Sequence, residues 1–249
     1  MLSNETSNSN IDVKKNDIDI NQNMHKGMGI VKLISLFLIG FGGMIIIGVI
    51  IGLILLPFEM GEATKDGIAE FISLGVILVA LGLAINKDIK WFKNDYKNWK
   101  GYLIGFGFGV AIILVSIAYQ EIINLFRAYE ISENERRLRA IISLYPALSI
   151  IFFCFIGPVC EEITYRVSLF NIFESKRWLA YLISIIVFTL AHFGFASSDI
   201  IGELINLPIY LLSAFALTFA YDKFGLAASL TAHTCNNLYA VIRYIIIGN

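Results

Sequence analysis

Long apolar runs, separated by short polar segments, dominate the chain from residue 33 onward. A helix that crosses the hydrocarbon core of a bilayer needs about 20 residues. The runs that reach or approach this length are 33–57, 67–86, 101–120, 140–160, 178–195, 204–221 and 225–247. The pattern therefore predicts an all-α fold, a polytopic transmembrane helix bundle of about seven helices, with six to eight as the range.

Two segments leave the helix count open by one. The fourth run is expected to continue as a helix beyond Glu161, because "EEITYRVSLFNIFE" keeps helical spacing. Residues 120–139, "QEIINLFRAYEISENERRLR", could hide an eighth crossing, but their pattern favours an amphipathic surface helix. No segment repeats with a period of 20–50 residues. We therefore predict a single membrane-embedded domain over residues 28–249.

Residues 1–27 differ from the rest of the chain, because they are polar and rich in Asn. We expect a disordered or loosely interfacial tail there and not a secretory signal. The whole chain of 249 residues is 57% hydrophobic and 16% charged, against roughly 25% charged residues in soluble domains. This composition predicts an integral membrane protein in contact with the lipid bilayer. A formal net charge of −1 gives no reason to expect a nucleic acid partner.

The distribution of lysine and arginine predicts the orientation in the membrane. Segment 87–100, "KDIKWFKNDYKNWK", carries five lysines against two aspartates, so we place it in the cytoplasm. Seven crossings then put the N-terminus in the cytoplasm as well. Arg136, Arg137 and Arg139 fall on the outer side in this scheme, which conflicts with the rule. The Asn-, Ile- and Lys-rich composition suits a low-GC bacterium and so a bacterial plasma membrane.

Three charged residues follow directly on the fourth apolar run. Ionisable groups at membrane depth are costly and usually face the bundle interior or a water-filled cavity. Residues four apart share a helix face, so Glu162 can form a structural ion pair with Arg166. Glu161 has Tyr165 at that offset and no cation nearby in its own helix, which favours a free carboxylate that acts as a general base. The alternative is that both glutamates mark a helix end at the interface.

Two histidines lie inside apolar runs, His192 in "VFTLAHFGF" and His233 in "ASLTAHTCNNLY". A lone histidine in a membrane helix can simply form an interhelical hydrogen bond, but each is also a candidate site residue. Asn236 and Asn237 follow His233 by three and four residues, and an amide there could fix an imidazole tautomer, bind a water or donate to an oxyanion. Phe188, four before His192, could line the same cavity or serve only in packing.

The predicted function rests on the convergence of Glu161, His192, His233 and Asn237 from three different helices. Depth in the membrane argues for caution. At ~1.5 Å of rise per residue, His233 lies near mid-membrane while His192 lies closer to the end of its span. A tilted or re-entrant helix would bring the two imidazoles to the same depth.

Three short motifs carry a resemblance to a known family. "EEITYR" matches E-E-x-x-x-R, "FTLAH" matches F-x-x-x-H and "HTCNN" matches H-x-x-x-N. In this order on successive membrane helices, the chain resembles the CAAX protease and bacteriocin-processing (CPBP, or Abi) family of intramembrane proteases, which includes the eukaryotic CAAX prenyl endopeptidases. The resemblance covers about residues 140–240. It implies a hydrolase, an intramembrane endopeptidase that cleaves a membrane-associated peptide or protein.

The resemblance also implies roles for individual residues. The matched positions are Glu161, Glu162, Arg166, Phe188, His192, His233 and Asn237. By position, Glu161 would activate the attacking water, and His192 and His233 would line the site. Asn237 would help to stabilise the tetrahedral oxyanion. The Glu162 and Arg166 positions agree with the structural ion pair inferred from spacing.

The use of a metal is open at this point. Glu161, His192 and His233 could supply three zinc ligands and leave a fourth position for water. If Glu161 binds zinc, however, it cannot also be the free general base. The family has been described both as metalloproteases and as glutamate-dependent enzymes. We favour a metal-free water activated by Glu161, with one zinc ion as the alternative.

Two other functions compete with proteolysis. One is a bacteriocin self-immunity or regulatory membrane protein that acts by binding and not by cleavage. The other is a proton-coupled transporter that uses Glu161 and the histidines as a relay. Transporters often contain internal inverted repeats, and the sequence shows none, so this reading is the weaker of the two.

Overall fold

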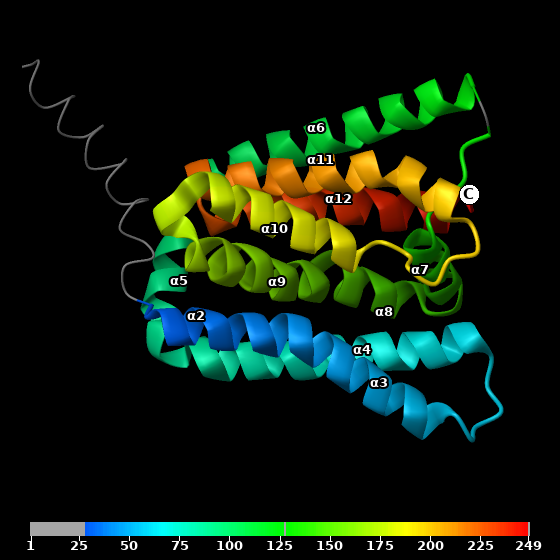
Figure 1. The fold of residues 1–249 in the computed structure, drawn as a ribbon, viewed down its shortest axis with the longest axis horizontal. Helices are drawn as coiled ribbons and strands as arrows, with labels where there is room; N and C mark the ends of the chain where they lie inside the picture. The colour runs from blue at the N-terminus through cyan, green and yellow to red at the C-terminus, as the bar shows by residue number, and fades with distance from the viewer. Residues whose placement is uncertain (1–27, 127, 249) are drawn as a thin grey trace, which may run out of the picture.

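The computed structural model describes residues 28–126 and 128–248, so the prediction for the tail 1–27 lies outside the described residues. The described chain is helical, with no strand within these ranges, and forms one bundle (Figure 1). The α-helices are α2 (Ile30–Phe37), α3 (Gly43–Leu55), α4 (Glu62–Ile85), α5 (Ile89–Asp95), α6 (Trp99–Asn124), α7 (Glu133–Leu144), α8 (Pro146–Ile151), α9 (Gly157–Glu161), α10 (Arg177–Ala191), α11 (Ile200–Phe224) and α12 (Leu226–Ile247). The all-α prediction is confirmed.

Short π- and 3₁₀-helical segments connect several of these helices. The π-helical segments are η1 (Leu38–Gly42), η3 (Phe152–Ile156) and η4 (Glu162–Phe170). The 3₁₀ segments are η2 (Asn86–Asp88) and η5 (Glu174–Lys176). π-helical turns inside α-helices are frequent at functional sites. Here η3 and η4 flank α9, which ends at Glu161.

Five helical stretches in the described part of the chain are long and apolar enough to cross a membrane. They are Ile30–Leu55, Glu62–Asp88, Trp99–Asn124, Pro146–Phe170 and Ile200–Phe224. The fourth of them begins at Pro146 and not at residue 140, and it runs beyond Glu161 as expected. With these five spans, the protein is an integral membrane protein.

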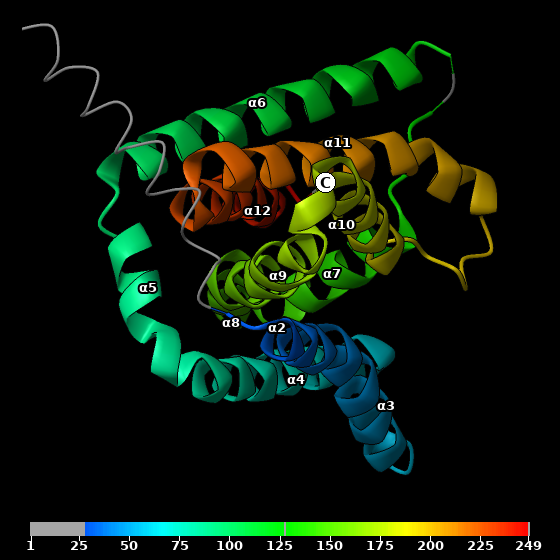
Figure 2. The same ribbon diagram turned by 60° about the vertical axis from the view of Figure 1, so that its left-hand side comes forward.

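The other two predicted spans correspond to α10 and α12, which complete the bundle. α10 has 15 residues, fewer than the about 20 that a full crossing needs. α12 has 22 residues, but its polar residues lower its hydropathy. Both helices pack against predicted spans, α10 against α11 and α12 against α6 (Figures 1 and 2). They bring polar side chains into the bundle because their neighbours shield them from lipid.

The arginine-rich segment before the fourth span forms α7, which is amphipathic and is not among the five spans. Its buried face carries Ile141 and Ile142. Each of its arginines has a carboxylate partner: the ion pairs are Arg136 with Glu133 at 2.5 Å, Arg137 with Glu70 at 3.1 Å and Arg139 with Glu135 at 2.6 Å. The structure has an amphipathic helix in place of an eighth crossing, but it covers Glu133–Leu144 and not 120–139, because residues 120–124 continue the span α6.

Glycines on α6 allow α12 to approach closely. A Cβ atom added at Gly105 would lie 2.3 Å from the carbonyl oxygen of Ala228, and one at Gly109 would lie 2.6 Å from Cβ of Cys235. Small residues at a helix interface let backbones approach in this way. The start of α12 is also fixed, because the carboxylate of Asp95 accepts the Ala227 N–H at 2.6 Å. Burial raises the pKa of Asp95 above its usual range, and the Ala227 N–H opposes this shift.

Candidate active site

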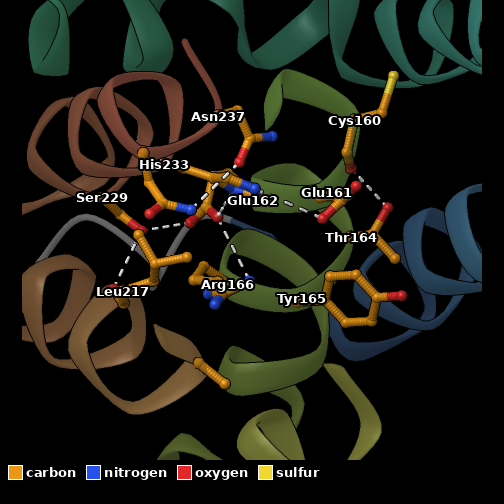
Figure 3. A network of polar contacts seen from close by, with 12 residues as sticks. Cys160, Glu161, Glu162, Thr164, Tyr165, Arg166, Leu217, Ser229, His233 and Asn237 are labelled. Carbon is orange, nitrogen blue, oxygen red and sulfur yellow. Dashed lines mark hydrogen bonds and ion pairs between the residues drawn. The ribbon is translucent and has the colours of Figure 1, made fainter. Parts of the chain in front are cut away.

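Glu162 lies fully buried at the centre of a polar network between η4 and α12 (Figure 3). Its Oε1 accepts a hydrogen bond from Nδ1 of His233 at 2.8 Å and lies 3.3 Å from the guanidinium of Arg166. Its Oε2 accepts the hydroxyl hydrogen of Ser229. The ion pair expected from the four-residue spacing is therefore present. Glu162 does more than neutralise Arg166, because it also orients a histidine.

Arg166 is also fully buried, and its guanidinium lies between a carboxylate and aromatic rings. The guanidinium carbon is 4.4 Å from the ring centroid of Phe188 and 5.9 Å from that of Tyr165. A cation over an aromatic face is stabilised, more so when it is desolvated. Phe188 in turn stacks on His192 at 4.4 Å and meets His233 edge-on at 6.0 Å. Phe188 therefore positions both imidazoles.

Glu161 points away from this network and into a cavity. Its side chain is 29% exposed, and its Oε2 lies 3.7 Å from Nε2 of His233 and 3.8 Å from Nε2 of His192. That oxygen has no hydrogen-bond partner among the described residues. The separations exceed the usual hydrogen-bond range of about 3.2 Å, and one bridging water fits distances of this size. The carboxylate thus lies near two imidazole nitrogens without a direct hydrogen bond to either.

Both histidines present Nε2 toward Glu161, because Nδ1 is engaged elsewhere. Nδ1 of His192 lies 2.8 Å from the carbonyl oxygen of Phe188, which can only accept, so Nδ1 donates. Nδ1 of His233 donates in the same way to the Glu162 carboxylate. A neutral imidazole with a protonated Nδ1 carries its lone pair on Nε2. Each histidine can therefore accept a proton at the atom that faces Glu161.

His192 reaches the site from the end of a short helix. α10 ends at Ala191, so His192 lies directly after the last residue of that helix. The carboxylate of Glu203 holds the chain that follows, because it accepts the N–H of Gly194 at 3.0 Å and that of Glu133 at 2.6 Å. The Nε2 atoms of His192 and His233 lie within 3.8 Å of the same Glu161 oxygen, so the two imidazoles meet at one place despite the predicted difference in depth.

Glu203 and Asn206 are functional candidates that sequence reasoning missed. Both are buried on α11 and bind the segments before and after the site. Asn206 donates to the carbonyl of Glu130 at 2.9 Å and accepts the hydroxyl hydrogen of Tyr129. Burial raises the pKa of Tyr129 above its usual range, which keeps this donor protonated. The sequence signal that could have identified them is the presence of two polar residues, three apart, within the apolar run "IIGELINLP".

Asn237 lines the cavity with the other three predicted residues. Its Nδ2 donates to the carbonyl oxygen of Phe153 at 2.9 Å and so ties α12 to η3. Nδ2 of Asn236 lies 3.5 Å from Oδ1 of Asn237. An amide group has two N–H donors, so each asparagine keeps a donor beyond the bond described here. The oxyanion role of Asn237 stays a prediction, and Asn236 is a second amide at the same place.

The cavity has a volume of about 1090 Å³ and reaches from these residues toward the end of the bundle that carries α7. Glu161, His192, His233 and Asn237 all line it, so the structure brings the four predicted residues together. Charged residues line its other end: Glu62, Lys65, Asp66, Glu70, Glu135, Arg137, Arg139 and Arg243. The lysine-rich α5 lies at the opposite end of the bundle (Figure 1). A cavity of this size can hold several residues of a peptide.

The predicted zinc ligands do not form a closed metal site. No group of three or more His, Cys, Asp or Glu side chains in the described ranges is placed to hold a metal ion. Ligands of a tetrahedral zinc with bonds of about 2.0–2.1 Å lie roughly 3.4 Å apart, while Glu161 lies 3.7 Å and 3.8 Å from the two imidazole nitrogens. The donors have the right chemistry for zinc, but their spacing does not fit it as placed.

Comparison with known proteins agrees with this site. Residues 143–239 match the family model of the Type II CAAX prenyl endopeptidase Rce1-like proteins. The UPF0177 protein YbdI of Lactococcus lactis subsp. lactis (strain IL1403) is 31% identical over 190 residues, which cover 75% of this chain and 99% of YbdI. The membrane-embedded CAAX protease MroQ of Staphylococcus aureus (strain USA300) is 25% identical over 185 residues, 69% of this chain and 70% of MroQ. No solved structure matches the chain.

The family-model match, residues 143–239, covers all three motifs of the candidate site. The chain belongs to the CPBP family of membrane-embedded, CAAX-type proteases, as the motifs predicted.

Proposed function

We propose that this protein is an intramembrane endopeptidase that hydrolyses a peptide bond of a membrane-associated peptide or protein. The observation that carries the proposal is the placement of Glu161. Its carboxylate is free of hydrogen bonds in the described structure, lies within 3.8 Å of two imidazole nitrogens and lines a cavity of about 1090 Å³. A general base needs this combination of access and an uncommitted proton acceptor.

The proposed reaction uses a water that donates one hydrogen bond to the Glu161 carboxylate and the other to Nε2 of one of the two histidines. Glu161 takes one proton from the water while its oxygen attacks the carbonyl carbon of the scissile bond. An amide N–H of Asn237 donates to the oxyanion that develops, and such a donor is worth about 10²–10³ in kcat in other proteases. The proton on Glu161 then passes to the leaving nitrogen, and the C–N bond breaks. The products are a free carboxyl group and a free amine.

We propose a metal-free mechanism, in which Glu161 activates a water beside the two imidazole nitrogens 3.7 Å and 3.8 Å away, with one zinc ion held by the same three residues as the alternative. We also propose that the protein lies in a bacterial plasma membrane with the N-terminus in the cytoplasm. The α7 arginines, which conflicted with this orientation, are each paired with a carboxylate. Carboxylates count little in the rule that sets topology, so these three arginines still oppose the proposed orientation.

The test uses purified wild-type protein and Glu161→Gln in lipid nanodiscs, with a panel of quenched membrane-peptide substrates in water enriched in ¹⁸O. We expect wild type to cleave, with ¹⁸O in the new carboxyl terminus, and Glu161→Gln to be inactive. Dialysis against a chelator should leave the wild-type rate unchanged. Loss of activity on chelation and recovery with zinc would contradict the metal-free proposal.

The alternative is a bacteriocin self-immunity or regulatory protein that acts by binding. It predicts that wild type cleaves no substrate, and that wild type and Glu161→Gln protect cells from a bacteriocin equally well. That result would overturn the protease proposal.

A further inference from the structure

Arg243 differs from the other cations that line the cavity, because it has no ion-pair partner among residues 28–126 and 128–248. Lys65 lies 3.4 Å from Glu62, while Arg137 and Arg139 form the ion pairs already described with Glu70 and Glu135. Arg243 is half-buried and forms no hydrogen bond or ion pair with any residue that the structure describes. An unpaired cation that is partly removed from water is costly unless a ligand neutralises it.

The carboxylates around Arg243 do not serve as this partner. Three of the four acidic side chains at this end of the cavity are engaged by Lys65, Arg137 and Arg139. The fourth, Asp66 on α4, lines the same cavity and has no ion pair within the described structure. Arg243 therefore remains available to a group that enters from outside the chain.

The position of Arg243 on α12 sets its distance from the reacting centre. Ten residues separate it from His233 on one helix, which corresponds to about 15 Å at 1.5 Å per residue. An extended peptide covers about 3.3 Å per residue, so the same distance spans four to five substrate residues. Between the two positions, α12 lines the cavity with Asn236, Asn237 and Ala240, so the path is continuous.

Glu161 lies at the reacting centre, and the far end carries both Arg243 and Asp66, which form no ion pair among the described residues. Glu161 at the reacting centre repels an anion, and Arg243 at the other end attracts one. A peptide with a carboxylate is thereby oriented along α12 in one direction only. Arginine also suits this task because its planar guanidinium binds a carboxylate with two parallel hydrogen bonds.

We propose that Arg243 binds a carboxylate of the substrate, four to five residues from the scissile bond. This assignment rests on the proposed endopeptidase function and deepens it, because it makes Arg243 a specificity-determining residue. The carboxylate is either an acidic side chain or the free C-terminus of the peptide. Both have the same chemistry, and the test separates them.

The experiment compares quenched peptides built on a core that wild type cleaves. One has Glu four residues from the scissile bond and an amidated C-terminus, one has Gln at that place, one has Lys, and one ends there in a free carboxylate. The enzymes are wild type, Arg243→Gln and Arg243→Glu. Arg136→Gln is the matched control, since Arg136 is exposed, paired with Glu133 and not part of the cavity lining.

We expect Arg243→Gln to raise KM about tenfold for the carboxylate peptides, the size of one lost charge-assisted hydrogen bond. Its kcat, and both constants for the Gln peptide, should stay at the wild-type values. Arg243→Glu should prefer the Lys peptide, and Arg136→Gln should behave as wild type. Whichever of the Glu and free-carboxylate peptides shows the effect identifies the source of the carboxylate.

Two results would overturn the assignment. One is an equal change for carboxylate and neutral peptides, which would mean that Arg243 only supports the fold. The other is an Arg243 effect that appears in phosphatidylglycerol nanodiscs and not in phosphatidylcholine nanodiscs, which would mean that it binds lipid phosphate.

Binding of the same labelled peptides to Glu161→Gln, measured by fluorescence anisotropy, separates this assignment from the protease proposal. A preference for the carboxylate peptides that disappears in Glu161→Gln/Arg243→Gln supports the assignment even if no peptide is cleaved. Equal binding of all peptides contradicts it.

Discussion

The helix that runs from α9 into η4 places two adjacent glutamates in opposite environments, one on its packed side and one on its cavity side. On the packed side, Glu162 is fully buried and every partner is fixed: Arg166, Ser229 and His233 (Figure 3). On the cavity side, Glu161 is 29% exposed and has no hydrogen bond among the described residues. A buried carboxylate in a membrane helix therefore supports the fold when donors occupy its oxygens. It can take part in chemistry when one oxygen has no hydrogen bond.

His192 and His233 both lie beside Glu161, but only His233 also binds Glu162. Replacing each of them should therefore separate catalysis from stability with the largest effect. His192 meets Glu161, and its one hydrogen bond among the described residues goes to a backbone carbonyl, while His233 meets Glu161 and is also bonded to the Glu162 carboxylate. We expect His192→Gln and His233→Gln each to lower kcat by about 10²-fold, because each change misplaces the attacking water beside Glu161.

Only the second change should also lower the unfolding temperature in detergent, because it leaves a buried carboxylate oxygen without its donor. Equal unfolding temperatures for the two variants would contradict the division between the sides. Activity is measured with a quenched peptide and unfolding by tryptophan fluorescence.

The ion pair on the packed side gives the next largest effect. Arg166→Met leaves Glu162 charged and uncompensated in the interior, and we expect a loss of about 3–5 kcal/mol in the free energy of unfolding. The double change Glu162→Leu/Arg166→Met should recover only part of this loss, because it removes the uncompensated charge but leaves His233 and Ser229 without the acceptor that Glu162 supplies. The control Arg136→Met breaks an exposed pair and should cost less than about 1 kcal/mol. A double variant no more stable than Arg166→Met would show that the pair is not the cause.

Glu203 tests whether the cavity side depends on how His192 is held. Glu203→Gln replaces an acceptor oxygen with a donor where the N–H groups of Gly194 and Glu133 both need acceptors. We expect kcat to fall about tenfold, as a small misplacement of a reacting group does, with KM unchanged. Proteolysis within residues 193–199 should also become faster. Glu121→Gln, on an exposed part of α6, is the control and should change neither kcat nor the rate of proteolysis.

The glycines of α6 give the smallest and most local test. Gly109→Ala places a Cβ atom 2.6 Å from Cβ of Cys235, and we expect a loss of about 1–3 kcal/mol from overpacking. Gly107→Ala, two residues away, meets no atom within 4 Å and should be neutral within about 0.5 kcal/mol. Denaturant or thermal unfolding of the two variants checks this. Equal stability of both would mean that α6 and α12 can separate without cost.

Much of the fold follows from the sequence, because apolar length and helical spacing act locally. The spans, the helix beyond Glu161 and the pair of Glu162 with Arg166 all depend on residues near one another in the chain. The early end of α10 was not predicted, because it depends on Glu203, which binds Gly194 from the next helix. The same holds for Ser229, whose bond to Glu162 joins residues 67 positions apart.

The sequence predicted which residues form the candidate site, but it did not predict how they are arranged. Motif spacing named Glu161, His192, His233 and Asn237, and the structure brings them to one cavity. Spacing could not show that Glu162 holds His233, since that contact depends on how η4 packs against α12. Nor could it show that Arg243 faces the same cavity from the far end of α12.

The central claim is that Glu161 performs the chemistry while Glu162 maintains the fold and the position of His233. The most direct test measures kcat and the unfolding temperature for Glu161→Gln and Glu162→Gln side by side. We predict that Glu161→Gln unfolds at the wild-type temperature and loses at least about 10³ in kcat. Glu162→Gln should unfold roughly 6–12 °C lower, which corresponds to a loss of about 3 kcal/mol in a chain of this size. An active Glu161→Gln, or a Glu162→Gln that unfolds at the wild-type temperature, would contradict the account.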